Sequence, residues 1–236
     1  MPSMPELQVL RVFCGAGGTG GNPLGVYLDG PAVASGERQA EAKRLGFSET
    51  VFVDDPETGA LQIFTPAVEL PFAGHPLVGT AWLLAQHGFS PTSLRPPAGE
   101  VPARVEGDRA FVAGRAEWQP DYEWMELGSP AEVEALDGPP PNARDMAAVY
   151  APIEDGAVRA RVFPVAIGIA EDEATGGAAV LLGARLGGAF TIHQGRGSVI
   201  DVVARDDGYV EVGGLVVSDQ ASAAPPASNT AAPTMK

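Results

Sequence analysis

The chain has 236 residues, 45% hydrophobic and 19% charged, which is typical of a folded globular protein and argues against a disordered or fibrous one. The chain has 15 Lys and Arg residues and 30 Asp and Glu residues, which gives a net charge of −15, and its basic residues form no stripe. Neither nucleic acid nor an anionic membrane is therefore an expected partner. The single cysteine excludes an internal disulfide. With no signal-like start and no long apolar run, the sequence predicts a soluble cytoplasmic protein.

Short apolar runs separated by glycine and proline predict a sheet-rich protein. In chain order, strands are expected at residues 7–13, 24–28, 50–53, 61–65, 101–105, 110–112, 148–151, 159–165, 198–205 and 209–212. Helices are expected at residues 36–45, 76–86, 130–136 and 176–186. The second and fourth helices are apolar nearly all round, so each should be enclosed on every side. The pattern therefore predicts two sheets, each wrapped around one buried helix.

Two segments, 63–84 and 162–182, follow the same plan. In each, a strand ends in proline, a polar loop follows, and an ionisable residue stands four positions before a glycine that precedes an apolar helix. The ionisable residue is His75 in the first segment and Asp172 in the second, and the glycines are Gly79 and Gly176. The repeat therefore makes His75 equivalent to Asp172.

The starts of these two helices are candidate anion sites. The first turn of a helix has unpaired N–H groups and a positive dipole end. Small residues at these positions, Gly79 and Thr80 in one helix and Gly176 and Gly177 in the other, would let a ligand approach the amides. A substrate carboxylate or a developing enolate held between the two ends would be stabilised without a metal ion.

Glu49 stands directly before an apolar strand, where partial burial would raise its pKa and suit it to general acid/base catalysis. The alternative is a solvated residue at the start of a strand. His75 precedes Pro76, so the alternative for the histidine is a helix cap, with Pro76 as the first helical residue. The three histidines are far apart and no cysteine pair exists, so no metal site is expected.

The glycine-rich stretch 15–21 does not predict a dinucleotide-binding loop. Such a loop opens a helix, whereas here Asn22 and Pro23 lead into a strand-like run. No cofactor is therefore expected from this stretch, which is interpreted as a turn bordering a pocket.

Several motifs, taken together and in order, resemble the PhzF-like family of phenazine biosynthesis. They are Gly21-Asn22-Pro23, Ser48-Glu49-Thr50-Val51-Phe52, Phe64-Thr65-Pro66, Glu69-Leu70-Pro71-Phe72-Ala73-Gly74-His75-Pro76, and Glu171-Asp172 with Ala174-Thr175-Gly176. The resemblance is strong over residues 7–90 and good again over 158–215.

The resemblance implies an α+β fold of two pseudo-repeated lobes, each a rolled, mostly antiparallel sheet around a central apolar helix, as in diaminopimelate epimerase. The lobes would span residues 1–116 and 117–217, with the active site in the cleft between them. Residues 218–236, rich in Ala, Ser, Pro and Thr, predict a disordered tail. By the same resemblance, the protein would be a homodimer.

The resemblance also implies a cofactor-independent isomerase that moves a proton on a small carboxylate-bearing metabolite, with no metal. The implied catalytic residues are Glu49, His75 and Asp172. The implied substrate-binding residues are Asn22, Gly74, Gly79, Thr80, Gly176 and Gly177. The family's related epimerases use a cysteine in each lobe, which this chain replaces by His75 and Asp172, so a two-thiol mechanism is not expected.

Two departures from the family pattern bear on function. Gly177 stands where the family usually has a serine, and the region 118–159 is shorter than usual, with a proline run at residues 139–141. These departures favour a second hypothesis, a non-catalytic small-molecule binder or partner protein that keeps the cleft. A third hypothesis, another non-redox reaction such as a cyclisation, would use the same site.

Overall fold

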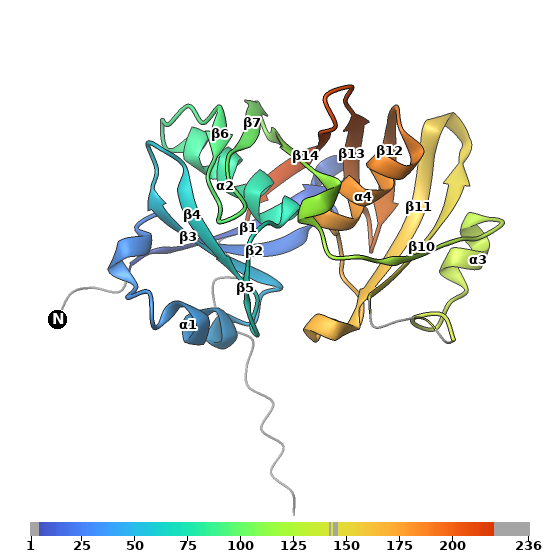
Figure 1. Ribbon diagram of the computed structural model, residues 1–236, viewed down its shortest axis with the longest axis horizontal. Coiled ribbons are helices and arrows are strands. Elements are labelled where there is room, and N and C mark those ends of the chain that lie inside the picture. Colours follow the sequence, from blue (N-terminus) through green and yellow to red (C-terminus); the bar gives the residue numbers. More distant parts are fainter. Residues whose placement is uncertain (1–4, 142, 144–145, 220–236) are drawn as a thin grey trace, which may run out of the picture.

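The computed structural model describes residues 5–141, 143 and 146–219 and has an α+β fold built on one long, curved sheet (Figure 1). The first half of the chain contains β1 (Leu7–Cys14), β2 (Asn22–Tyr27), α1 (Arg38–Leu45), β3 (Glu49–Asp55), β4 (Ala60–Phe64), β5 (Glu69–Leu70), α2 (Gly74–Gln86), β6 (Ser93–Leu94), β7 (Val101–Glu106) and β8 (Arg109–Gly114). The second half contains β9 (Glu123–Glu126), α3 (Pro130–Glu134), β10 (Met146–Ile153), β11 (Ala157–Pro164), α4 (Gly176–Leu186), β12 (Ala189–Gln194), β13 (Ser198–Ala204) and β14 (Val210–Ser218).

The sheet runs in the order β5-β4-β3-β2-β1-β14-β13-β12-β11-β10-β9, and β8 branches from β14 to continue through β7 to β6. Only the pairs β2–β3, β9–β10 and β11–β12 are parallel among the described strands. The predicted fold class, a mostly antiparallel α+β protein in two similar halves, is confirmed, but the two sheets expected from the sequence are joined into one continuous sheet.

The strand β14 joins the two halves of the molecule. It pairs with β13 over Val210–Gly213, and beyond Gly214 with β1, where Ser218 lies opposite Leu10. Its first part also pairs with β8. The last strand of the chain therefore completes the sheet of the first half as well as that of the second.

Each half encloses one of the two apolar helices, which lie side by side in the middle of Figure 1. Every residue of α2 from Gly74 to Leu84 is buried. Full burial of leucines such as Leu77 and Leu84 stabilises the fold by about 1.5–3 kcal/mol each. The helix α4 is buried only in its first two turns, and Leu186 at its end is 45% exposed. The expectation that both helices are enclosed on every side is therefore confirmed for Gly74–Leu84 of α2 and wrong for the last turn of α4, and Gln86 at the end of α2 is exposed as well.

The predicted strands and helices are found, most of them with ends shifted by a few residues, together with four further strands. The sequence does not predict β5, β6, β9 and β12. The strand β14 continues to Ser218, which contradicts a tail that begins at that residue, and the rest of the predicted tail, 220–236, lies outside the described residues. The helix α2 begins at Gly74 after Ala73, so His75 is its second residue rather than its cap. Within the described residues, no helix is long and apolar enough to cross a membrane.

Candidate active site

The N-termini of α2 and α4 meet where the two halves of the molecule face each other. A Cβ atom on Gly74 would lie 2.8 Å from the backbone of Gly176, and one on Gly176 would lie 2.7 Å from the Cα of Gly74. No side chain caps either helix, so the free N–H groups of both first turns converge with the positive ends of both dipoles. This close approach makes Gly74, and not Gly79, the counterpart of Gly176.

Gly79 and Thr80 do not belong to this convergence. Because α2 begins at Gly74, Gly79 lies in its second turn, where the backbone amide is beyond the free first turn. A Cβ on Gly79 would come within 2.5 Å of Leu24 and 2.8 Å of Val12, and Thr80 is fully buried. The structure does not bring Gly79 and Thr80, which the sequence assigns to substrate binding, to the helix starts, and the glycine lets α2 pack closely on β1 and β2.

Glu49 opens β3, whose parallel pairing with β2 sets it opposite Leu24. The residue is 8% exposed, and its Oε2 atom has no hydrogen-bond partner within the described part of the chain. Burial raises the pKa of Glu49 from 4.5 to about 7, although a hydrogen bond with Ser48 opposes the shift. Near neutral pH the carboxyl is populated in both protonation states and can therefore accept or donate a proton.

His75 faces Glu49 from the first turn of α2. Its Nδ1 atom lies 3.3 Å from Glu49 Oε2, and its Nε2 atom has no partner among the described residues. Burial lowers the pKa of His75 to about 4, against the opposing effects of the Asp172 charge and of a hydrogen bond with the backbone of Pro23. The imidazole is therefore neutral at neutral pH and does not form an ion pair with Glu49.

Asp172 lies in the loop before α4, where its backbone N–H donates to the carbonyl of Val162 at 3.0 Å. Burial, followed by the nearby charge of Glu49, raises the pKa of Asp172 to about 6, whereas His75, Thr175 and Asn22 favour the charged form. Both carboxylate oxygens are already bonded: Asn22 Nδ2 donates to Oδ1 at 2.8 Å and Thr175 Oγ1 donates to Oδ2 at 2.7 Å. Asp172 is therefore held in one orientation.

Asn22 lies behind Asp172 and is absent from the lining of the cavity described below. Besides Asp172, its Nδ2 donates to the carbonyl of Ala174 at 2.9 Å, and its Oδ1 accepts from Ser48 Oγ at 3.1 Å. The structure therefore does not bring Asn22, which the sequence assigns to substrate binding, into the lining of this cavity. Asn22 ties the first half of the chain to the loop that carries Asp172.

Gln194, at the end of β12, is a positioning residue that the sequence analysis missed. The buried Gln194 donates from Nε2 to the carbonyl of Asp172 and to Thr175 Oγ1, each at 2.9 Å. Its Oε1 accepts from the backbone N–H of Thr175 at 3.3 Å. The signal that could have identified Gln194 is its place in β12, and β12 is not predicted from the sequence.

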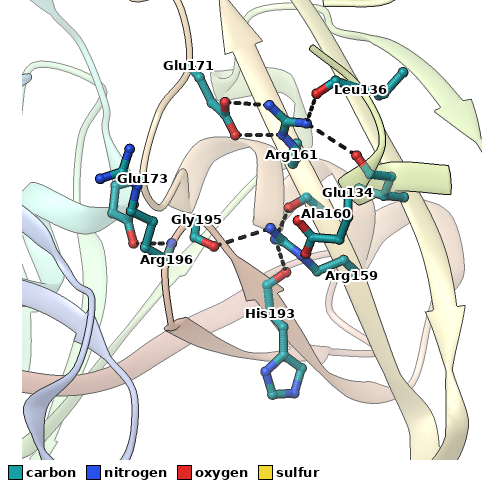
Figure 2. A network of polar contacts seen from close by, with 11 residues as sticks. Glu134, Leu136, Arg159, Ala160, Arg161, Glu171, Glu173, His193, Gly195 and Arg196 are labelled. Carbon is teal, nitrogen blue, oxygen red and sulfur yellow. Dashed lines mark hydrogen bonds and ion pairs between the residues drawn. The ribbon is translucent and has the colours of Figure 1, made fainter. Parts of the chain in front are cut away.

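A network of ion pairs fixes the other side of the same loop (Figure 2). Arg161 on β11 donates to both carboxylate oxygens of Glu171, at 2.8 and 2.7 Å, and also to the carbonyl of Leu136. Glu173 accepts at Oε1 from the backbone N–H of Arg196 at 2.8 Å and from Ser198 Oγ at 2.7 Å. The residues on both sides of Asp172 are thus anchored to the sheet.

A cavity of about 440 Å³ brings the candidate residues together. Its lining includes Glu49, Gly74, His75, Asp172, Gly176 and Gly177. Most other side chains that line it are apolar, among them Phe72, Trp118, Tyr122, Met146, Ile167 and Ile169. No lysine or arginine is among the described residues of the lining, so an anionic ligand would depend on the two helix ends. No group of three His, Cys, Asp or Glu within the described ranges could hold a metal ion.

Comparison with known proteins gives consistent relatives. Residues 12–138 match the family model of phenazine biosynthesis-like proteins, PhzC-PhzF. The chain is 30% identical over 221 residues to trans-2,3-dihydro-3-hydroxyanthranilate isomerase of Pseudomonas fluorescens, and the match covers 77% of each chain.

Solved structures share the fold. A PhzF-family phenazine biosynthesis protein from Enterococcus faecalis has a TM-score of 0.71 at 19% identity, covering 90% of this chain and 95% of its own. A hydroxyproline epimerase from Agrobacterium vitis has a TM-score of 0.59 at 12% identity, covering 90% of each chain. At these identities the likeness extends to the fold alone.

Proposed function

The chain belongs to the family of phenazine biosynthesis-like proteins, PhzC-PhzF, and from this premise we propose that it is an isomerase that moves a proton on a small carboxylate-bearing metabolite. Glu49 is the proposed acid/base. The observation that carries the proposal is a buried carboxyl with a pKa of about 7 that lines the cavity where two helix N-termini converge. A group that titrates near the working pH can both take and return a proton.

The proposed reaction has two steps. The Glu49 carboxylate takes a proton from a carbon of the substrate, and the electron pair of the broken C–H bond delocalises toward the substrate carboxylate. The protonated Glu49 then gives the proton to another carbon, so the composition of the substrate is unchanged and only its bonding differs. Such a transfer uses an acid/base group and no redox cofactor.

The developing negative charge is stabilised by the surroundings of the cavity. The free N–H groups at the starts of α2 and α4 are fixed before the reaction and face the place where the charge forms. Neutral His75 adds no charge that would hold Glu49 permanently ionised. Asp172, held by Asn22 and Thr175, orients the polar groups of the substrate from the opposite side.

The name of the Pseudomonas fluorescens relative supports a cyclic amino-hydroxy acid as the substrate and a role in secondary metabolism. A cyclic acid fits a cavity that is largely apolar apart from its helix ends and a few polar side chains. The homodimer and the cytoplasmic location expected from the sequence analysis stay predictions.

The proposal is tested by adding trans-2,3-dihydro-3-hydroxyanthranilate to the purified protein and following its conversion by chromatography. We expect turnover by the parent protein, and a kcat about 10²–10⁴-fold lower in Glu49→Gln with binding retained. Glu57→Gln, which changes an exposed glutamate in the turn after β3, is the matched control and should react as the parent does.

Two results would contradict the proposal in different ways. Full turnover by Glu49→Gln would exclude Glu49 as the acid/base. Binding of this compound and of related cyclic acids without turnover of any of them would favour the non-catalytic binding protein.

A further inference from the structure

Gln119 is a polar side chain of the cavity to which the proposed function gives no role. It follows the short 3-10 turn Ala116–Trp118, and its backbone N–H donates to the carbonyl of Ala116 at 3.0 Å. Trp118 packs against Phe72 and Tyr209 with ring centroids 5.6 and 5.9 Å apart, and this packing holds the turn in place. Gln119 is therefore presented to the cavity from a fixed segment.

The side chain of Gln119 occupies the space next to the start of α4. A Cβ atom on Gly177 would lie 2.6 Å from Gln119 Oε1, so the glutamine stands where any side chain at position 177 would begin. Its Nε2 donates to the carbonyl of Arg115 at 3.3 Å. No described residue donates a hydrogen bond to Oε1, which leaves a free acceptor at the edge of the cavity.

The two carboxyl groups that line the cavity, those of Asp172 and Glu49, already have roles in the proposed function. Both Asp172 oxygens accept hydrogen bonds from Asn22 and Thr175, and Glu49 exchanges the proton in the proposed reaction. A substrate carboxylate bound to the amides of α4 would set its neighbouring carbon close to Gln119. A free amide oxygen at that place recognises a hydrogen-bond donor.

We propose that Gln119 is a specificity-determining residue, whose Oε1 accepts a hydrogen bond from an amino group on the carbon next to the one that bears the substrate carboxylate. The inference rests on the proposed function, because it takes the carboxylate to be bound at the start of α4. It also explains why position 177 is a glycine: a larger residue would displace the glutamine.

The test compares two unreactive carboxylates, anthranilate and benzoate, which differ only in the amino group next to the carboxylate. Their dissociation constants are measured by isothermal titration calorimetry. The parent protein should bind anthranilate about fivefold more tightly than benzoate, because one additional hydrogen bond typically contributes a gain in affinity of about this size. Gln119→Leu should bind the two compounds equally while keeping its affinity for benzoate.

A second variant guards against a folding defect in the first. Gly177→Ala meets only the end of the flexible Gln119 side chain, so it should fold, displace the glutamine and lose the same preference. Gln86→Leu, at the exposed end of α2, is the matched control and should keep the fivefold difference within about a factor of two.

The outcomes separate this inference from the proposed function. Equal binding of both compounds by the parent protein, or a preference that survives Gln119→Leu, overturns the role of Gln119 and leaves the carboxylate site intact. Failure of the parent protein to bind either compound overturns the carboxylate site, and the role of Gln119 with it.

Discussion

Three buried ionisable side chains set the chemistry at the scale of single residues. Burial moves the two carboxyls and the imidazole in opposite directions, with pKa values of about 7 for Glu49, about 6 for Asp172 and about 4 for His75. Each shift reduces the charge carried near neutral pH. Near pH 7 the shift is felt most by Glu49, whereas Asp172, with a pKa of about 6, stays mostly ionised.

The raised pKa of Glu49 should make the free energy of unfolding depend on pH. The unfolded chain loses the proton near pH 4.5, whereas the native protein keeps it until about pH 7. The stabilisation from the protonated, buried carboxyl is therefore complete below pH 4.5 and is lost as the pH rises through about 7. Relative to Glu49→Gln, the free energy of unfolding of the parent should fall by about 3 kcal/mol between these limits.

Urea denaturation of both proteins at several pH values measures this difference. Glu57→Gln, in an exposed turn, should show no comparable pH-dependent difference from the parent. A constant difference between the parent and Glu49→Gln across the whole range would mean that Glu49 is solvated in the native state.

The candidate residues differ in how far the sequence reveals them. Glu49 stands directly before an apolar strand, so its burial is predictable, whereas His75 and Asp172 are singled out by the internal repeat. The role of Asn22 was not predictable, because its partner Asp172 is 150 residues away and only the folded chain brings them together. Gln194 is hidden for the same reason, since its bonds to Asp172 and Thr175 depend on the position of β12 beside the loop.

At the scale of elements, the site depends on how closely the starts of α2 and α4 approach. The sequence predicts both apolar helices, and α4 with its observed bounds. The internal repeat was aligned by the spacing from His75 and Asp172, which put the wrong glycine of α2 opposite Gly176. Spacing along the chain does not reveal where a helix begins, because Gly74, His75 and Pro76 continue the helix in place of capping it.

The strands that were missed depend on their partners. The strands β5 and β6 have only two residues each, and β9 and β12 lie parallel to β10 and β11, whose positions decide their pairing. In a short, half-exposed strand the alternation of apolar and polar residues is too weak for the strand to be recognised from the sequence alone.

The contact between α2 and α4 gives a sharp mutational prediction. In Gly176→Ala the new methyl would lie 2.7 Å from Gly74 Cα and His75 N, which are backbone atoms that cannot move away alone. We expect a loss of about 1–3 kcal/mol in the free energy of unfolding. A shift of the helix ends by about 1 Å should lower kcat about 10²-fold.

Thermal unfolding and turnover of Gly176→Ala are compared with those of Gly177→Ala, whose methyl meets a side chain instead of the backbone. The neighbouring variant should keep most of its stability. An equal loss of stability in the two variants would contradict the close contact of the helix starts.

At the scale of the whole molecule, the two halves are separate in sequence but share β14. We propose residues 1–116 and 117–217 as the two lobes, with β14 as the strand that belongs to both. Its residues beyond Gly214 pair with β1, so they complete the sheet that surrounds α2. The cavity between the halves is thereby held by a continuous sheet.

The sharing of β14 predicts that the first lobe does not fold alone. A fragment of residues 1–116 keeps β2 beside β1 and β7 beside β8 but lacks β14, which pairs with both β1 and β8, and would expose part of the surface around α2. Circular dichroism and urea denaturation should show no cooperative transition for this fragment, in contrast to a single transition for the full chain. A cooperatively unfolding fragment would show that β14 is dispensable for the first lobe.

The central claim is that the cleft between the halves transfers a proton through Glu49. The most direct measurement is the pH dependence of kcat/KM with a substrate whose own carboxylate stays ionised, because this profile reports the ionisations of the free enzyme. We expect the activity to fall as the pH drops through about 7, where Glu49 takes up its proton. Full activity down to pH values near 5, with no loss around 7, would contradict the claim.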